Sequence, residues 1–281
     1  MVAGGASSQE ARSTCIIASA MTDIPSSPDY DRRFGGVSRL YGAPALARFR
    51  AAHVCIVGIG GVGSWTAEAL ARSGVGALTL VDLDHVAESN LNRQIHALEG
   101  TLGRAKIEAM AERILQINPE CRLTLVDDFI APDNLDALLG PLEKLDVLVD
   151  AIDGVRAKTA LLAWCRAHGL AVVTAGAAGG QLDPTRIQVA DLARTQQDPL
   201  LAKVRSQLRK SHGFPKDTKK KFGIEAVYSE EPLRYPEASC APGQGSGGLN
   251  CAGFGSTVTV TASFGLAAAA VALRRLAGAK G

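Results

Sequence analysis

Aromatic residues are scarce in this 281-residue chain, and paired cysteines are absent from it. Phe, Trp and Tyr make up 5% of the residues although 47% are hydrophobic, so the core must be built mainly from Ala, Val, Leu and Ile. Such cores are typical of helices packed on a parallel sheet. The six cysteines form no Cys-x-x-Cys pair, which argues against a zinc site and against a disulfide framework.

The chain also has little net charge, +2 from 30 basic and 28 acidic residues, so its overall charge does not indicate a nucleic-acid partner. The charge is unevenly distributed, however. Residues 203–221 hold eight Lys and Arg, ending in Lys219, Lys220 and Lys221, and a single acid, Asp217. Such a run either contacts RNA phosphates or forms a solvated basic loop.

Strand and helix patterns alternate from residue 53 onward. Short apolar runs ended by Gly or Asp predict buried strands, and the 3.6-residue spacing of apolar residues between them predicts helices. The predicted strands are residues 54–57, 77–81, 123–126, 147–149 and 171–174, with one antiparallel strand at 187–189. The predicted helices are residues 64–73, 104–117, 133–139 and 155–168. This βαβ series predicts a Rossmann-like α/β fold, a doubly wound, mostly parallel sheet with helices on both faces.

A glycine-rich turn joins the first strand to the first helix. It reads Gly58-Ile-Gly60-Gly61-Val-Gly63, where the backbone can approach a phosphate at a helix N-terminus. The aspartate that ends the second strand, Asp82, is placed to bind ribose hydroxyls. A nicotinamide or flavin enzyme could show the same pattern.

The following motifs favour a nucleotidyl-transfer enzyme over a hydride-transfer enzyme. Asn90 and Arg93 lie in Ser89-Asn-Leu-Asn-Arg-Gln94, Lys106 lies on the next helix, and Asp153 follows the fourth strand. Cations next to a nucleotide can neutralise the charge that develops on the α-phosphate and on departing pyrophosphate. Solvated helix charges and a turn-forming asparagine are the structural alternatives.

Together these motifs, with Asp82-Leu-Asp84, resemble the ubiquitin-activating-type adenylating superfamily. The resemblance implies that the glycine loop, Asp82, Asp84 and Asn90 bind ATP, with Arg93 and Lys106 on the triphosphate. It implies that Asp153 holds Mg²⁺ and that Arg39, in an upstream Arg-Phe-Gly-Gly-Val-Ser-Arg segment, completes the site of a partner subunit in a homodimer.

Further segments resemble the tRNA threonylcarbamoyladenosine dehydratases within that superfamily. They include Arg33-Phe-Gly-Gly-Val-Ser-Arg-Leu-Tyr-Gly, Gln116-Ile-Asn-Pro-Glu-Cys and Gly179-Gly-Gln-Leu-Asp-Pro-Thr. The family adenylates the carboxylate of threonylcarbamoyladenosine at position 37 of tRNA, and ring closure then expels AMP. The resemblance therefore implies a tRNA partner bound by Lys219, Lys220 and Lys221. It leaves open a monovalent cation and a sulfur-transfer partner related to cysteine desulfurases.

Other functions stay open at this point. An activating enzyme for a ubiquitin-like or sulfur-carrier protein is one, and Cys240 in a Gly-rich loop could hold its thiol position. Another is a non-catalytic nucleotide-binding sensor.

The expected organisation has four parts. Residues 1–28 are a disordered leader, 29–190 the ATP-binding adenylation core, 191–250 a basic and irregular substrate-binding segment, and 251–281 an apolar helix packing back on the core. We expect a cytoplasmic protein. That helix approaches the length of a membrane span, which leaves membrane association as an alternative.

Overall fold

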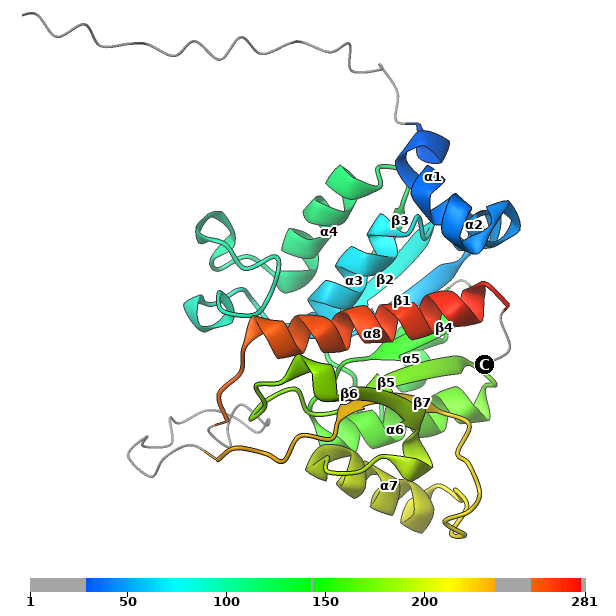
Figure 1. Ribbon diagram of the computed structural model, residues 1–281, viewed down its shortest axis with the longest axis vertical. Coiled ribbons are helices and arrows are strands. Elements are labelled where there is room, and N and C mark those ends of the chain that lie inside the picture. The colour runs from blue at the N-terminus through cyan, green and yellow to red at the C-terminus, as the bar shows by residue number, and fades with distance from the viewer. Residues whose placement is uncertain (1–28, 143, 236–253, 279–281) are drawn as a thin grey trace, which may run out of the picture.

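A seven-stranded sheet forms the centre of the molecule, in the order β3-β2-β1-β4-β5-β7-β6 (Figure 1). The computed structural model describes residues 29–142, 144–235 and 254–278. The strands are β1 (His53–Val57), β2 (Ala77–Val81), β3 (Arg122–Val126), β4 (Val147–Asp150), β5 (Ala171–Ala175), β6 (Ile187–Asp191) and β7 (Glu225–Ser229). All neighbours pair in parallel except β6, which runs antiparallel to β7. The predicted α/β fold class and the antiparallel strand are confirmed.

Alternate residues of the central strands pack into two separate hydrophobic cores, one on each face of the sheet. Val54 and Ile56 of β1 pack into one core, and Cys55 and Val57 into the other. Successive side chains of a strand point to opposite faces, so a strand that is apolar throughout must be covered on both sides. The free edge is different, because β3 carries exposed positions along its length.

Helices cover both faces of the sheet. One face is covered by α1 (Tyr30–Tyr41), α2 (Ala43–Ala51), α3 (Gly63–Arg72), α4 (Lys106–Ile117) and α8 (Val258–Leu276). The other is covered by α5 (Leu135–Leu139), α6 (Val155–Ala167) and α7 (Pro199–Ser211). Short 3₁₀ helices lie at Glu88–Asn90, Glu99–Thr101, Pro184–Arg186 and Leu192–Arg194.

Within the stretch 191–250, the described residues 191–235 hold more regular structure than their sequence indicates. Helix α7 buries Leu201, Val204 and Leu208, which are spaced three and four residues apart on one face. Strand β7 inserts between β5 and β6. The high density of charge on the other face of α7 hides its apolar stripe. Residues 191–235 therefore contribute a strand to the main sheet and a helix to its cover.

Helix α8 packs across the sheet and against α3. Gly265 lies at the crossing with α3, where an added Cβ would come within 2.4 Å of the Val62 carbonyl oxygen. The Thr66 hydroxyl donates to the Gly265 carbonyl at 3.0 Å. The helix is long and apolar enough to cross a membrane, but half of its most apolar window is buried inside this fold. Its apolarity is that of a packed core helix, so it is only a weak candidate for a membrane span.

Candidate nucleotide site

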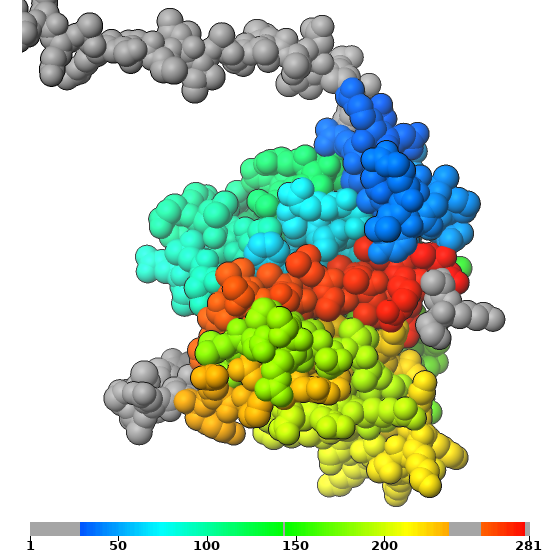
Figure 2. All heavy atoms as spheres, viewed as in Figure 1, coloured from blue at the N-terminus to red at the C-terminus, as the bar shows by residue number. Residues whose placement is uncertain are grey.

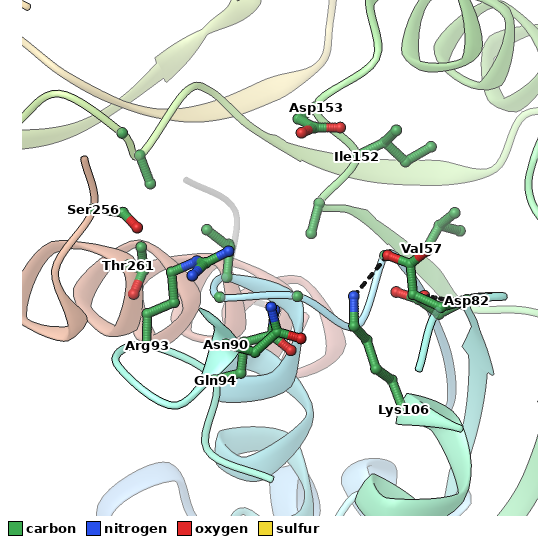
Figure 3. A pocket seen from close by; sticks show the side chains of 18 of the residues that line it. Val57, Asp82, Asn90, Arg93, Gln94, Lys106, Ile152, Asp153, Ser256 and Thr261 are labelled. Carbon is green, nitrogen blue, oxygen red and sulfur yellow. Dashed lines mark hydrogen bonds and ion pairs between the residues drawn. The ribbon is translucent and has the colours of Figure 1, made fainter. Parts of the chain in front are cut away.

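A cavity of about 700 Å³ opens at the carboxyl ends of β1 to β5 (Figure 3). It lies where the strand order reverses between β1 and β4, which is where open α/β sheets bind ligands. Its walls come from the loops that follow these strands, from the segment between β2 and α4, and from the start of α8. Residues of the glycine loop, the Asp82 segment, the Asn90 segment and the Asp153 loop all line it.

The glycine loop forms the cavity wall between β1 and α3. Gly58 has a φ of +88°, which side-chain-bearing residues rarely adopt. A Cβ on Gly63 would lie 1.8 Å from the Gly58 carbonyl oxygen, so no larger residue fits there. Gly60 and Gly61 line the cavity, and nothing lies within 4 Å of a Cβ on Gly60. The loop thus presents open backbone at the N-terminus of α3, as phosphate binding requires.

Asp82 lies at the end of β2 and fixes the glycine loop from the side. One carboxylate oxygen accepts from the Ile59 amide at 2.6 Å, and the other accepts from the Asp84 amide at 2.9 Å. Burial raises the pKa of this carboxyl, while the nearby Lys106 ammonium acts to lower it. Asp82 therefore orders two cavity walls as well as lining the cavity.

Lys106 is the first residue of α4, and its ammonium reaches the cavity beside Asp82. Its Nζ forms an ion pair with Asp84 at 2.7 Å (Figure 3). The lysine side chain is buried, whereas the Asp84 carboxylate is mostly exposed. Asp84 therefore holds the ammonium at the cavity, where a nucleotide phosphate could interact with it.

Arg93 and Asn90 come from the irregular segment between β2 and α4. The Arg93 guanidinium donates to the Ser89 carbonyl at 2.6 Å and to the Asn92 side chain at 2.9 Å. Its aliphatic stem crosses Gly61, where a Cβ would meet Arg93 Cγ at 3.2 Å. The Arg93 side chain is half-buried, and this burial lowers the pKa of its guanidinium. Asn90 lines the cavity and also accepts from the Ala87 amide at 3.1 Å, so it is a turn former as well.

Asp153 lies on the opposite wall, in the loop that follows β4. Figure 3 shows it across the cavity from Arg93 and Lys106. Among the described residues, no group of three or more His, Cys, Asp or Glu side chains is placed to hold a metal ion. Mg²⁺ commonly takes one or two carboxylates and completes its shell with phosphate oxygens and water, so a single exposed Asp153 fits this requirement.

A buried ion pair underlies the Asp153 loop. Lys158 and Asp150 are both 0% exposed, and their charged atoms lie 2.9 Å apart. The Lys158 ammonium also donates to the Ile152 carbonyl at 2.8 Å, and Asp150 accepts from the Thr174 hydroxyl at 2.7 Å. The sequence pattern suggests no such role for Lys158, which looks like an ordinary helix lysine. The pair fixes the backbone that carries Asp153.

Other cavity residues come from segments that the motifs do not mark. Gln94 is buried and its Oε1 has no hydrogen-bond partner in the described structure. Phe129 is 61% exposed at the end of β3. Ser256 lies just before α8 and Thr261 in its first turn, and the Ser256 carbonyl accepts from the Asn92 side chain at 2.9 Å. Phe129 could have been found from its place after a parallel strand. The α8 residues arrive only through tertiary packing.

Some predicted residues lie away from this cavity. Arg39 is exposed on α1 and does not line it. Lys219, Lys220 and Lys221 are exposed in the loop after α7. Cys240 and the leader, residues 1–28, lie outside the described residues.

The described cysteines are buried in the cores. Cys55, Cys121 and Cys165 are free thiols. Burial raises the pKa of Cys55 and of Cys121 to about 12. These thiols therefore pack as small apolar side chains.

Comparisons with known proteins agree with this geometry. The chain is 53% identical over 252 residues to the tRNA threonylcarbamoyladenosine dehydratase of Escherichia coli (strain K12), covering 87% of this chain and 93% of that protein. It is 50% identical over 251 residues to the Haemophilus influenzae protein of the same name, covering 88% and 94%. The crystal structure of the E. coli dehydratase in complex with ATP matches with a TM-score of 0.80 at 52% identity, covering 89% of this chain and 96% of that one.

A protein-family model matches almost all of the described structure. The match runs from residue 30 to residue 281, so it includes the sheet, the cavity and α8. The chain belongs to the ThiF family.

Proposed function

We propose that this enzyme uses ATP to adenylate the carboxylate of threonylcarbamoyladenosine in tRNA and then closes that side chain into a ring. The observation that carries the proposal is the cavity itself. Two cations, Arg93 and Lys106, face the Asp153 carboxylate across a space bounded by a glycine loop. The similarity to dehydratases, one of them crystallised with ATP and with AMP, supports the same reaction.

The first step forms a bond between a substrate carboxylate oxygen and the α-phosphorus of ATP, and breaks the bond to pyrophosphate. Negative charge grows on the leaving pyrophosphate. The partly desolvated Arg93 guanidinium and the Lys106 ammonium are placed to stabilise that charge. The glycine loop would hold the phosphates through its open backbone, whose N–H groups donate hydrogen bonds to the phosphate oxygens.

The second step is an attack by a nucleophile of the same side chain on the activated carbonyl carbon. The carbonyl–oxygen bond to AMP breaks, and the proton of the nucleophile is released. An intramolecular nucleophile has a high effective concentration, so the enzyme needs no covalent intermediate of its own. The sum of the two steps removes one water from the nucleoside. No redox partner, sulfur donor or monovalent cation is needed for this balance.

Magnesium belongs to the proposal through Asp153. When bound, Mg²⁺ would neutralise phosphate charge next to that carboxylate. The buried Lys158–Asp150 pair fixes the backbone on which Asp153 lies. Asp153 is therefore held in place by the fold and remains free to meet a cation.

A homodimer would explain Arg39. This guanidinium is exposed on α1, outside the cavity of its own chain, on a helix beside exposed Leu40 and Tyr41. We propose that it enters the cavity of a second copy, where it would add a third cation at the triphosphate.

The basic segment would hold the tRNA backbone. Lys219, Lys220 and Lys221 are exposed beyond the end of α7, away from the cavity. We place the reaction in the cytoplasm, where tRNA and ATP are both found.

Mass spectrometry of tRNA nucleosides from a strain lacking this chain tests the function. The cyclic nucleoside should disappear, and its precursor, heavier by one water, should accumulate. Re-expression of the intact chain should restore the cyclic form, and the Arg93→Gln chain should not. Unchanged cyclic nucleoside in the deletion strain would contradict the proposal. Adenylation of a carrier protein that ends in Gly-Gly, without any effect on tRNA, would support the alternative activating enzyme.

A further inference from the structure

The outer face of α7 has a second hollow, separate from the nucleotide cavity. Its volume is about 420 Å³, and it is lined by Ala202, Arg205, Ser206, Arg209, Lys210 and Lys216. Four of these six residues are cationic and none is acidic. Figure 2 shows α7 and the yellow segment after it on the surface, at the end of the molecule opposite α1.

The two arginines lie one helical turn apart, and each is anchored by a neutral group. The Arg205 guanidinium donates to the Thr195 hydroxyl. Arg209 Nε donates to the Pro215 carbonyl at 3.2 Å, and this guanidinium lies 5.0 Å from the centre of the Phe222 ring. Each guanidinium has five N–H donors and uses one in these contacts, so most donors remain available.

These cations repel one another. Burial lowers the pKa of Arg205, the Arg209 charge lowers it further, and Asp198 acts in the opposite direction. Within the described part of the chain, neither arginine forms an ion pair with a carboxylate. Like charges four residues apart on a helix destabilise it, so the arrangement is one that a bound anion would stabilise. Guanidinium pairs suit phosphate because their planar donors match its oxygens.

The direction of α7 connects this hollow to the nucleotide cavity. The carboxylate of Asp198 caps the helix by accepting from the Leu201 amide at 2.9 Å, and also accepts from the Ala177 amide at 2.9 Å. Ala177 lines the nucleotide cavity. The helix leads away from that point for 13 residues, about 20 Å. Arg205 comes seven residues after Asp198, which is about 10 Å along the helix.

We propose that a backbone phosphate of the tRNA substrate binds between Arg205 and Arg209, with Lys210 and Lys216 at the rim. A tRNA whose modified nucleotide enters the cavity must continue outward as a stem, and α7 leads outward from the same cavity. The lysines after α7 would then contact phosphates farther along that stem. This inference rests on the proposed function, since it takes tRNA as the substrate.

The test measures tRNA affinity by fluorescence anisotropy across a salt series. Each phosphate contact contributes roughly 0.9 to the slope of log affinity against log salt concentration. The Arg205→Gln/Arg209→Gln variant loses one phosphate contact, so it should lower the magnitude of that slope by about 1 and weaken binding roughly tenfold or more at ~0.1 M salt. The exposed pair Lys210→Gln/Lys216→Gln should act in the same direction. Since its side chains support no packing, this pair decides the question if the arginine variant does not fold.

The control is Arg32→Gln/Arg72→Gln, which removes the same charge from exposed side chains of α1 and α3. It should leave the slope nearly unchanged. An equal loss in the control, or an unchanged slope in both α7 variants, overturns the proposal. Binding of polyglutamate is measured in the same way. If the α7 variants keep their tRNA affinity but lose affinity for polyglutamate, the proposal is overturned and an acidic protein partner is indicated. The intact chain is assayed in parallel for AMP production on modified tRNA. No AMP would refute the proposed function, whereas AMP production with unaffected α7 variants would refute this site alone.

Discussion

Replacing Lys158 with methionine should be one of the most destabilising single changes in the chain. The side chain is fully buried against Asp150, also fully buried, with a 2.9 Å ion pair between them. Removing one partner of such a pair leaves an uncompensated charge and costs about 3–5 kcal/mol. For a chain of this size each kcal/mol lowers the melting temperature by roughly 2–4 °C, so the expected decrease is roughly 6–20 °C.

A matched control separates burial from charge pairing. Arg104 and Glu112 form an ion pair at 2.8 Å, but both side chains are exposed. Arg104→Met should therefore cost only about 0–1 kcal/mol. Urea unfolding followed by circular dichroism gives the free energy of unfolding for both variants.

A double variant tests the cause. Asp150→Asn in the Lys158→Met background removes the unpaired charge. Its carbonyl oxygen can still accept from the Ile152 amide, and its NH2 group can donate to the Thr174 hydroxyl oxygen. Part of the lost stability should return. If Lys158→Met costs no more than Arg104→Met, or if the double variant is less stable than the single one, the reasoning about this buried pair is wrong.

Three further predictions concern the site and its surroundings. Arg93→Gln or Lys106→Gln should each lower turnover by on the order of 10²-fold or more, because each cation acts mainly on charge that develops in the transition state. AMP release under saturating ATP and tRNA measures this effect, and a change in KM alone would contradict it. Burial, with help from the Lys106 and Arg113 charges, lowers the pKa of His96 from 6.5 to about 4. The unfolded chain therefore binds a proton between these values that the folded chain does not. Stability should then fall as pH decreases through this window, by about 2 kcal/mol more from pH ~7 to pH ~5 than in His96→Gln. Parallel unfolding curves of the two proteins at both pH values would refute the buried neutral imidazole. Finally, mixing inactive Arg39→Ala with inactive Asp153→Ala subunits should recover part of the activity, because one site of the mixed dimer would be intact. No recovery despite demonstrated subunit exchange would remove Arg39 from the partner's site.

The sequence predicts the sheet well, because buried parallel strands are short apolar runs that end at special residues. The first strand, expected at residues 54–57, is observed as His53–Val57, and the second, expected at 77–81, is observed at those bounds. The glycine loop is equally easy to recognise from the sequence. Gly58 needs a positive φ and Gly63 has no space for a Cβ, so few other residues could stand there.

Elements defined by long-range packing are harder to predict. The many charged residues of α7 make its apolar stripe hard to recognise in the sequence. Strand β7 is recognisable only once β5 and β6 are placed on either side of it. Lys158 looks like a surface residue until its helix is seen to cover β4. The same limit applies to Thr261, because its place in the cavity depends on α8 crossing α3 at Gly265.

The most direct test of the proposed reaction is product analysis with the purified protein, ATP labelled at the α-phosphate, and tRNA carrying threonylcarbamoyladenosine. The account predicts labelled AMP, unlabelled pyrophosphate and the cyclic nucleoside in equal amounts, with none of them formed when tRNA is omitted. Production of ADP and phosphate, or AMP formation without conversion of the nucleoside, would contradict it.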